Sequence, residues 1–422
     1  MITAMHKRFF VTAVILGFST IGMAQSTLVL TNPLGMERSD ELIVCSRKVL
    51  EQKLGKIAAG KFIILKSKAN RPMVAQFDDL NGDGNWDEVA FLYSFKPKEK
   101  AVINIAMSDR LATIKAVVRA HVRLRKKNAD ESFGPAVMEE TMPVQNPGTD
   151  FSKQPLPNYL TEGPAWENDK VAFRQYLDVR NGRDIFGKRV THMVMDSVGV
   201  VVEPSYHDLH DWGMDVLHVG KSLGAGAIAM QVKINGKDSL VRLGGAAITK
   251  TVYTQISDGP VRAIFRMQYD WNVNGKKVQV TDETSIWGGQ YFYQSKITLK
   301  GAPAGAKLVE GIAKFNENIS KHFEAGNAAV LYSHGKQSEN KDELGMAIMV
   351  NRKGFAGFGA APDTAAEIMN TYLVKQSIMN QPLVYRFYAG WIYSDSRFAD
   401  ITYFEQFLRK EGSKLSAPIT IF

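Results

Sequence analysis

The fold is decided by the stretch from Val261 to Leu299, which reads V-R-A-I-F-R-M-Q-Y-D-W-N-V-N-G-K-K-V-Q-V-T-D-E-T-S-I-W-G-G-Q-Y-F-Y-Q-S-K-I-T-L. It contains three long segments rich in β-branched and aromatic residues, which favour strands. Asn274-Gly275 and Gly288-Gly289 separate the segments, and such dipeptides are typical of tight hairpin turns. The stretch therefore predicts three successive antiparallel strands of the length found in a large sandwich.

Segments of the same kind continue on both sides of this stretch. Strands are predicted before it at 227–234, 239–243 and 251–256, and after it at 328–332, 346–350 and 383–389. Residues 396–410 have the clearest helical pattern, and Gly412 follows its end. We therefore expect the body of the chain, residues 159–422, to be an all-β, supersandwich-like antiparallel β-sandwich with few helices, one of them near the C-terminus.

The N-terminal part, residues 25–127, is expected to form a separate β layer. Short β-rich segments follow each other closely at 27–31, 42–45, 62–65, 73–77, 89–93 and 101–105. Residues 113–124 alternate almost perfectly between apolar and polar side chains, so we predict one long strand there. Residues 128–158 carry five prolines and are expected to be a loop-rich connector to the body.

The first 24 residues have the pattern of a secretory signal peptide. A basic group at 6–8 precedes a short apolar run at 9–21, and small residues precede the expected cleavage after Ala24. No segment reaches the ~18 apolar residues that a membrane span needs. We therefore expect a periplasmic or secreted protein without a membrane span. Cys45 is the only cysteine, which excludes an intramolecular disulfide.

The net charge of the whole chain is +9, and removal of the signal peptide with Lys7 and Arg8 lowers it to +7. An excess of positive charge favours anionic partners such as an acidic polysaccharide. Nucleic acid is not expected, because the basic run at 123–127 has no aromatic residues between its charges to stack on bases. The composition leaves the oligomeric state open.

Oxygen-bearing side chains alternate in a short loop, at Asp79, Asn81, Asp83 and Asp87. With Gly84 at the sixth position, they match the beginning of a calcium-binding loop. The twelfth position is Ala90, where an EF-hand has a bidentate Glu, so an EF-hand is not predicted. Two interpretations stay open: a structural calcium site, and an Asx-rich turn between two strands. No other cofactor is expected.

The stretch from Tyr206 to Gly226 reads Y-H-D-L-H-D-W-G-M-D-V-L-H-V-G-K-S-L-G-A-G and has neither a helical nor a strand period. It holds three of the eight histidines, His207, His210 and His218. Ionisable side chains on a loop above a rigid scaffold are typical of functional sites, although a solvated surface loop is the alternative. The spacing of His207 and His210 suits a metal ion or a proton-transfer pair.

Residues 171–179 alternate between an apolar face and a face that presents Arg174, Tyr176 and Asp178. We expect this polar face either to line a cleft or to be a solvated sheet face with cross-strand ion pairs. Four tryptophans are expected to be stacking platforms for sugar rings or core residues: Trp166, Trp212, Trp287 and Trp391.

Four motifs resemble one known family. They are E-G-P-A-W-E at 162–167, Y-L-D-V-R-N-G-R-D-I-F-G-K at 176–188, the stretch from Tyr206 to Gly226, and Y-A-G-W at 388–391. They look like the secreted domain-of-unknown-function family numbered 4861, over nearly all of the mature chain. Members of that family occur with polysaccharide-degrading systems, and at least one activity in it is an oligosaccharide dehydratase acting on ulvan fragments. The resemblance implies a β-sandwich enzyme that works on uronic acids.

Removal of water from a terminal uronic acid requires a base, an acid for the departing hydroxyl and a cation for the carboxylate. We predict that His207 and His210 supply the base and the acid, with Tyr176 as a partner. Arg174 or Arg180 would bind the carboxylate. The residues predicted to bind the acidic oligosaccharide are Trp166, Glu167, Arg180, Lys188, Trp212, Asp215, Trp287 and Trp391. The alternatives are a non-catalytic carbohydrate-binding protein and a sugar epimerase or lyase on a similar scaffold.

Overall fold

The computed structural model describes residues 25–143, 147–316, 318–364 and 366–422. The predicted signal peptide lies outside these residues. Strands make up 48% of the structure and helices 9%, and the sheets are antiparallel, which confirms the predicted all-β class. Within the described ranges, no helix has both the length and the apolar character needed to cross a membrane.

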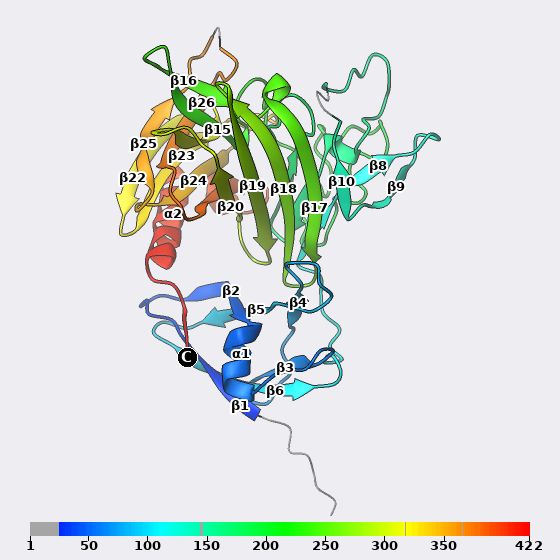
Figure 1. Cartoon of the computed structure of the whole chain (residues 1–422), viewed down its shortest axis with the longest axis vertical. Coiled ribbons are helices and arrows are strands. Elements are labelled where there is room, and N and C mark those ends of the chain that lie inside the picture. Colours follow the sequence, from blue (N-terminus) through cyan, green and yellow to red (C-terminus); the bar gives the residue numbers. More distant parts are fainter. Residues whose placement is uncertain (1–24, 144–146, 317, 365) are drawn as a thin grey trace, which may run out of the picture.

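The largest sheet has nine strands, and the stretch from Val261 to Leu299 forms its centre (Figure 1). As predicted, β18 (Arg262–Val273), β19 (Lys276–Trp287) and β20 (Phe292–Lys300) are consecutive antiparallel neighbours. Asn274 and Gly275 turn between the first two with φ of 49° and 80°. The sheet continues on one side with β17 (Ile248–Asp258) and β10 (Glu139–Thr141), and on the other with β27 (Leu383–Trp391), β24 (Leu344–Asn351), β23 (Ala328–Gly335) and β22 (Ile319–Ala325).

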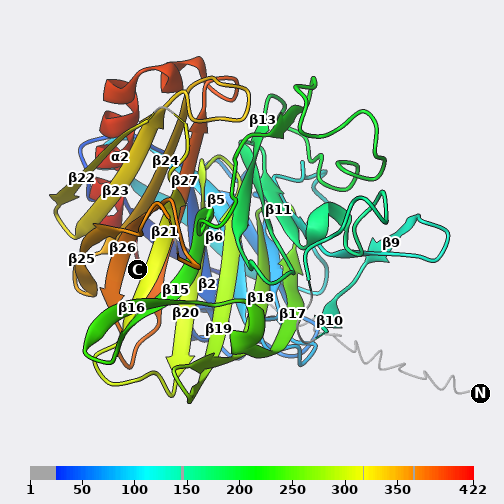
Figure 2. The same ribbon diagram turned by 90° about the horizontal axis from the view of Figure 1, so that it is seen from above.

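Two five-stranded sheets form the second layer of the sandwich (Figure 2). The first has the order β14 (Gly213–Asp215), β13 (Arg183–Lys188), β12 (Val171–Gln175), β11 (Ala165–Asn168) and β7 (Ala120–Arg123). The second has the order β16 (Lys237–Arg242), β15 (Ala225–Ile234), β21 (Lys307–Ala313), β26 (Thr371–Ser377) and β25 (Phe355–Ala360).

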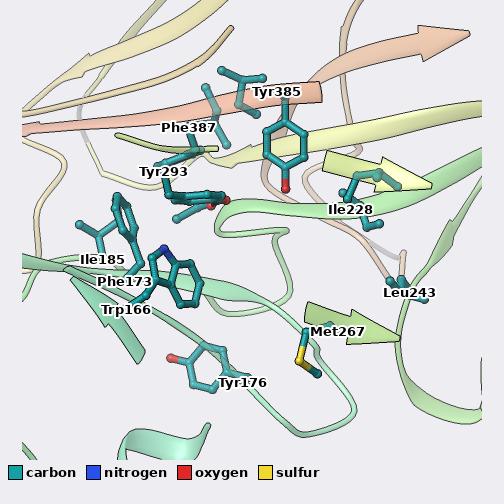
Figure 3. Packing of buried hydrophobic residues seen from close by; sticks show 14 of the residues in the cluster. Trp166, Phe173, Tyr176, Ile185, Ile228, Leu243, Met267, Tyr293, Tyr385 and Phe387 are labelled. Atoms are coloured by element: carbon teal, nitrogen blue, oxygen red, sulfur yellow. Dashed lines mark hydrogen bonds between the residues drawn. The ribbon is translucent and has the colours of Figure 1, made fainter. Parts of the chain in front are cut away.

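The main core fills the space between the two layers. Figure 3 shows its aromatic centre, where Trp166 of β11 and Phe173 of β12 meet Tyr293 of β20 and Phe387 of β27. The ring centroids of Trp166 and Tyr293 are 5.3 Å apart, and those of Phe173 and Tyr293 4.9 Å, both edge to face. Such pairs add ~0.5–1.5 kcal/mol to the burial of the rings, so this cluster fixes the first five-stranded sheet on the large sheet.

One buried arginine also joins the two layers. Arg183 of β13 donates to Asp282 Oδ2 at 2.6 Å, to Ser295 Oγ at 2.8 Å and to Tyr385 OH at 2.9 Å. Its charge is thus matched by one carboxylate, and three hydroxyl groups and the side-chain oxygen of Gln175 accept the remaining hydrogen bonds. A buried ion pair needs such additional bonds to offset the cost of removing both charges from water.

The predicted C-terminal helix is α2, Ile401–Ser416, which begins after Asp400. The Asp400 carboxylate accepts a hydrogen bond from the Thr402 backbone N–H at 2.8 Å and so caps the first turn. Phe404 and Leu408 of α2 pack on the outer face of the nine-stranded sheet.

A smaller unit with its own core lies below the sandwich in Figure 1. Its strands are β1 (Gln25–Thr31), β2 (Arg38–Ser46), β3 (Phe62–Ser67), β4 (Gln76–Asp78), β5 (Glu88–Phe95), β6 (Lys100–Ser108) and β28 (Thr420–Ile421). They form two sheets, β28-β1-β6-β3 and β2-β5-β4, which enclose helix α1 (Arg47–Leu54) in one cluster. β28 pairs with β1, so the C-terminal end of the chain completes the N-terminal unit.

The long strand predicted for residues 113–124 is wrong in its first half. Only Ala120–Arg123 is a strand, and it pairs with β11 of the body. Residues 112–119 cross between the units, where Arg119 donates both to Asp40 of the smaller unit and to Asp169 of the body. A segment with alternating apolar and polar side chains forms a strand only where a partner strand bonds to its backbone. In the described part of the chain, the crossing segment has no such partner.

Candidate functional site

The candidate site lies on the outer face of the first five-stranded sheet. Arg174 on β12 stands directly opposite Asp184 on β13, and Phe186 on β13 stands opposite Asp215 on β14. Because side chains alternate along a strand, these residues point away from the main core, which Phe173 enters from the other face. The polar face predicted for residues 171–179 is formed only in part, because β12 ends at Gln175 and Asp178 lies in the turn that follows. Both faces of this sheet are buried.

Arg174 is the centre of the site and is only 1% exposed. Its Nη2 donates to Asp184 Oδ2 at 2.7 Å and to Asp215 Oδ2 at 2.8 Å. Its Nη1 donates to Glu162 Oε2 at 3.2 Å and to the hydroxyl of Tyr206 at 3.1 Å. These partners occupy the guanidinium group, so the predicted contact of Arg174 with a substrate carboxylate is not available in this structure. Arg174 instead positions the groups around it.

Tyr176, the predicted acid–base partner, belongs to this buried network. Its hydroxyl accepts a hydrogen bond from Arg174 Nη2 at 2.6 Å and donates to Asp184 Oδ2 at 2.6 Å. Burial, above all, raises the pKa of Tyr176 well above its usual value. The phenol is therefore a fixed neutral donor inside the network rather than a group that faces the solvent.

Negative charge exceeds positive charge around Arg174, because four carboxylates, Glu162, Asp178, Asp184 and Asp215, share two guanidinium groups, those of Arg174 and Arg180. Burial, followed by the charge of Asp184, raises the pKa of Asp215 well above its usual value. Asp215 was predicted to bind substrate, but it is buried beneath the surface and acts on the neighbouring side chains.

A strained turn places Glu162 in this network. Thr161 and Glu162 have φ of 52° and 63°, in the left-handed region that non-glycine residues rarely adopt. Buried Arg123 holds the turn by donating to Leu160 O at 2.9 Å, to Gly163 O at 3.1 Å and to Thr161 Oγ1 at 3.0 Å. Backbone strain of this kind persists where the surroundings over-determine it, which is common at functional sites.

His207 lies at the surface directly above the network, with 58% of its side chain exposed. Its Nδ1 is 3.6 Å from Asp215 Oδ2, and its ring centroid is 4.5 Å from that of Tyr206. Burial and then the charge of Arg174 lower the pKa of His207, so the imidazole is neutral at neutral pH. Its Nε2 has no hydrogen-bond partner among the described residues and is free to accept a proton.

Tyr206 complements His207. Its hydroxyl oxygen accepts a hydrogen bond from Arg174, which leaves its own proton available to another acceptor. Burial raises the pKa of Tyr206, so this proton is present at neutral pH. The ring of a proton acceptor thus lies 4.5 Å from the half-buried ring of a proton donor.

His210, the second predicted acid–base residue, is placed differently. Its Nε2 lies 2.7 Å from the carbonyl oxygen of Ser205, and its ring stacks on Trp212 at 6.0 Å. A ring nitrogen bound to a carbonyl carries the proton and cannot act as a base. His210 thus contacts Ser205 and Trp212, whereas His207 contacts Tyr206 and Asp215.

A second histidine–carboxylate pair, His218 with Glu339, received no predicted role. His218 Nδ1 is 3.3 Å from Glu339 Oε1 and its side chain is 54% exposed. The backbone N–H of Glu339 donates to Val216 O at 2.9 Å, which places the β23–β24 connection beside Asp215. The charge of Glu339 also acts on His207, against the lowering of its pKa by burial and Arg174. No sequence signal links Glu339 to this site.

Three of the predicted sugar platforms are core residues. Trp166 is 1% exposed inside the aromatic centre, and Trp287 is buried against Phe292. Trp391 covers Gly187, where a Cβ atom would overlap the indole ring, and its N–H donates to Asp342 at 2.7 Å. These indoles cannot stack on a sugar in this structure, because neighbouring residues of the core cover them.

Glu167 and Lys188, both predicted to bind substrate, form a closed ion pair. Lys188 Nζ lies 2.5 Å from Glu167 Oε2, and both side chains are fully buried. The other oxygen of Glu167 accepts hydrogen bonds from the backbone N–H groups of Val194 and Met195, each at 2.7 Å. The pair therefore anchors the loop that covers the outer face of the sheet.

Arg180 is the predicted cation that reaches the solvent, with 34% of its side chain exposed. Its Nη2 bonds Glu162 at 3.2 Å and Asp178 at 2.5 Å, and its guanidinium lies 3.8 Å from the centre of the Tyr176 ring. Its Nη1 has no protein partner in the described ranges and can donate to an anionic ligand.

The predicted calcium loop uses its oxygens internally. Asp79 accepts from the backbone N–H groups of Gly82 and Gly84, each at 2.7 Å, and Asp87 accepts from that of Leu80 at 2.8 Å. In the described part of the chain, no three or more His, Cys, Asp or Glu residues are grouped to hold a metal ion. These hydrogen bonds are those of an Asx-rich turn, and the structural calcium site stays a prediction.

Comparison with known proteins extends over almost the whole chain. Residues 30–421 match the family model described as "Domain of unknown function (DUF4861)". A relative, "Uncharacterized protein P7" of Formosa agariphila, is 22% identical over 418 residues, which are 93% of this chain and 92% of that protein.

Two solved structures from Enterococcus faecalis are also similar. One is an alpha-mannosidase, with a TM-score of 0.45 and 10% identity, and the other is a protein in glycosyl hydrolase family 38, with a TM-score of 0.50 and 8% identity. The alignments cover 94% of this chain but only 46% and 47% of those chains, so this chain spans about half their length. The second likeness shows a shared fold.

Proposed function

The chain belongs to the DUF4861 family, and we propose that it is a carbohydrate-active enzyme that removes water from a terminal uronic acid of an acidic oligosaccharide. The observation that carries this proposal is His207: a neutral, exposed imidazole, backed by buried Asp215 and lying against Tyr206. The fold shared with a protein described as a member of glycosyl hydrolase family 38 supports the class of carbohydrate substrate.

The proposed reaction is an elimination. His207 Nε2 takes the proton from the carbon α to the carboxyl group, and the electrons of that C–H bond form the new C=C bond. The C–O bond to the neighbouring hydroxyl breaks, and the departing oxygen takes the proton of Tyr206 and leaves as water. Transfer of a proton from imidazolium to phenolate restores both groups. Arg180 Nη1 would bind the carboxylate and stabilise the charge that develops on it.

The carboxylates of the site do not suit hydrolysis of a glycosidic bond. That reaction uses two carboxyl groups that flank the bond and reach the sugar or a water molecule. Asp184 and Asp215 are buried and bind the same guanidinium nitrogen. Elimination through an exposed imidazole needs neither of them to touch the substrate.

Mass spectrometry after incubation with uronic-acid oligosaccharides tests the proposal, because the product is lighter by one water and gains ultraviolet absorbance. His207→Ala should lower kcat about 10²–10⁴-fold, whereas His322→Ala on the exposed edge strand β22, the matched control, should change it less than threefold. Full activity of His207→Ala would contradict the proposal. Binding without any product would indicate a carbohydrate-binding protein, and a product of unchanged mass an epimerase.

A further inference from the structure

A cavity of about 340 Å³ lies beside the site, on the other side of Glu162. The segment 147–159 forms one wall, and Glu162, Leu177 and Asp178 form the other. Glu162 belongs to both places, because its Oε2 accepts from Arg174 while its Oε1 accepts from Arg180. Its carboxylate therefore separates the cavity from the network beneath His207.

The lining of this cavity is polar, and its described residues carry three carboxylates, Asp150, Glu162 and Asp178, against one cation, Lys153. Lys153, the cation among the described lining residues, pairs with Asp150 at 2.7 Å. Glu162 and Asp178 are held by Arg180, which lies outside the lining. A second anionic sugar would therefore meet an excess of negative charge in the lining. Hydroxyl groups can donate to the free lone pairs of these carboxylates.

We infer, on the basis of the proposed function, that this cavity is the subsite for an uncharged sugar residue linked to the uronic acid. Its volume is at the lower end of the ~300–1,000 Å³ typical of ligand pockets, which suits a small part of the substrate. The amides of Gln154 and Asn158 lie in its wall and supply both donors and acceptors for hydroxyl groups. The substrate is then at least a disaccharide, with its charge on the residue at His207.

Three substrates test this inference: the methyl glycoside of glucuronic acid, the same uronic acid linked to a neutral hexose, and a disaccharide of two glucuronic acids. The disaccharide with the neutral hexose should have a kcat/KM about tenfold above the other two, equivalent to ~1.4 kcal/mol of additional binding. Gln154→Trp, which fills the cavity, should abolish this advantage and leave the methyl glycoside unchanged. Asn158→Ala should reduce the advantage, and Lys237→Trp on the exposed β15–β16 hairpin is the matched control.

Equal kcat/KM values for the three substrates, or an unchanged preference in both Gln154→Trp and Asn158→Ala, would overturn the inference. Isothermal titration of the His207→Ala variant with the disaccharide that has the neutral hexose measures binding at the subsite independently of the reaction. Weaker binding by the double variant His207→Ala, Gln154→Trp than by His207→Ala alone supports the subsite even if no elimination is detected. Unchanged binding refutes it even if elimination occurs.

Discussion

Two buried arginines on opposite faces of one sheet show how similar residues serve different purposes. Arg183 points into the sandwich, where one carboxylate, Asp282, matches its charge. Arg174 points to the outer face, where three carboxylates surround it and the exposed imidazole of His207 lies above. The inner network is closed and balanced in charge. The outer one carries excess negative charge next to solvent, and this excess raises the pKa of Asp215 in addition to the effect of burial.

The contrast separates stability from chemistry. Balanced charge in a closed core leaves no group able to exchange a proton, so the Arg183 network joins the two layers and does nothing else. Excess carboxylate near an opening leaves one group holding a proton that a neighbour can share. Perturbed groups that meet at a surface are typical of catalytic sites.

The largest expected effect comes from removing the cation of the closed network around Arg183. Arg183→Met should destabilise the protein by about 3–5 kcal/mol, because it leaves Asp282 buried without a counter-charge. Urea unfolding followed by circular dichroism measures this. Adding Asp282→Asn should recover part of the loss. An unchanged unfolding midpoint in the single variant would show that the core network does not hold the layers together.

The second prediction concerns removal of the cation from the outer network. Burial, then the charge of Arg174, lowers the pKa of His207, so Arg174→Gln should raise this pKa by removing the cation while the carboxylates remain. The base is then neutral only at higher pH. The acid limb of the kcat/KM profile should therefore move to higher pH, in addition to a fall in the maximum. A lower maximum with an unmoved limb would contradict the coupling of Arg174 to His207.

A smaller effect is expected at the edge of the same sheet. His121 lies 3.2 Å from Asp196, in the loop that covers the outer face, and 3.0 Å from Asp258. Burial alone would lower its pKa, but the two carboxylates raise it to about 10. Because the folded pKa exceeds the unfolded value of ~6.5, the stabilisation is complete below pH ~6.5 and is lost as the pH rises towards 10.

Comparison of His121→Gln with the natural chain checks this pH dependence. The variant should lose about 1–3 kcal/mol of stability at pH 6 and much less near the folded pKa of about 10. Denaturant unfolding at the two pH values gives the difference directly. A constant difference between the two chains would mean that packing, rather than charge, is what His121 contributes.

The sandwich could be predicted because its hairpin turns and strand patterns depend on residues that are neighbours in the sequence. The Asn274-Gly275 turn and the segments beside it determine β18 and β19 without information from elsewhere in the chain. The same local pattern predicted too long a strand at 113–124, because it does not show where a partner strand is missing. The exposed His207 and the polar face with Arg174 were also found from local pattern.

The rest of the site depends on contacts between distant segments. A conspicuous tryptophan motif does not distinguish a sugar platform from a core residue, and Trp391 is in the core because Gly187 leaves room for its ring. Lys188 was expected to face substrate because its partner Glu167 could not be recognised. Glu339 reaches His218 from the β23–β24 connection, which no spacing within the histidine stretch predicts.

The pairing of β28 with β1 has a consequence for biosynthesis. The N-terminal unit is the first to be translated, yet its four-stranded sheet lacks an edge strand until Thr420 and Ile421 have left the ribosome. Its exposed edge on β1 must therefore stay unpaired during translation of the entire sandwich.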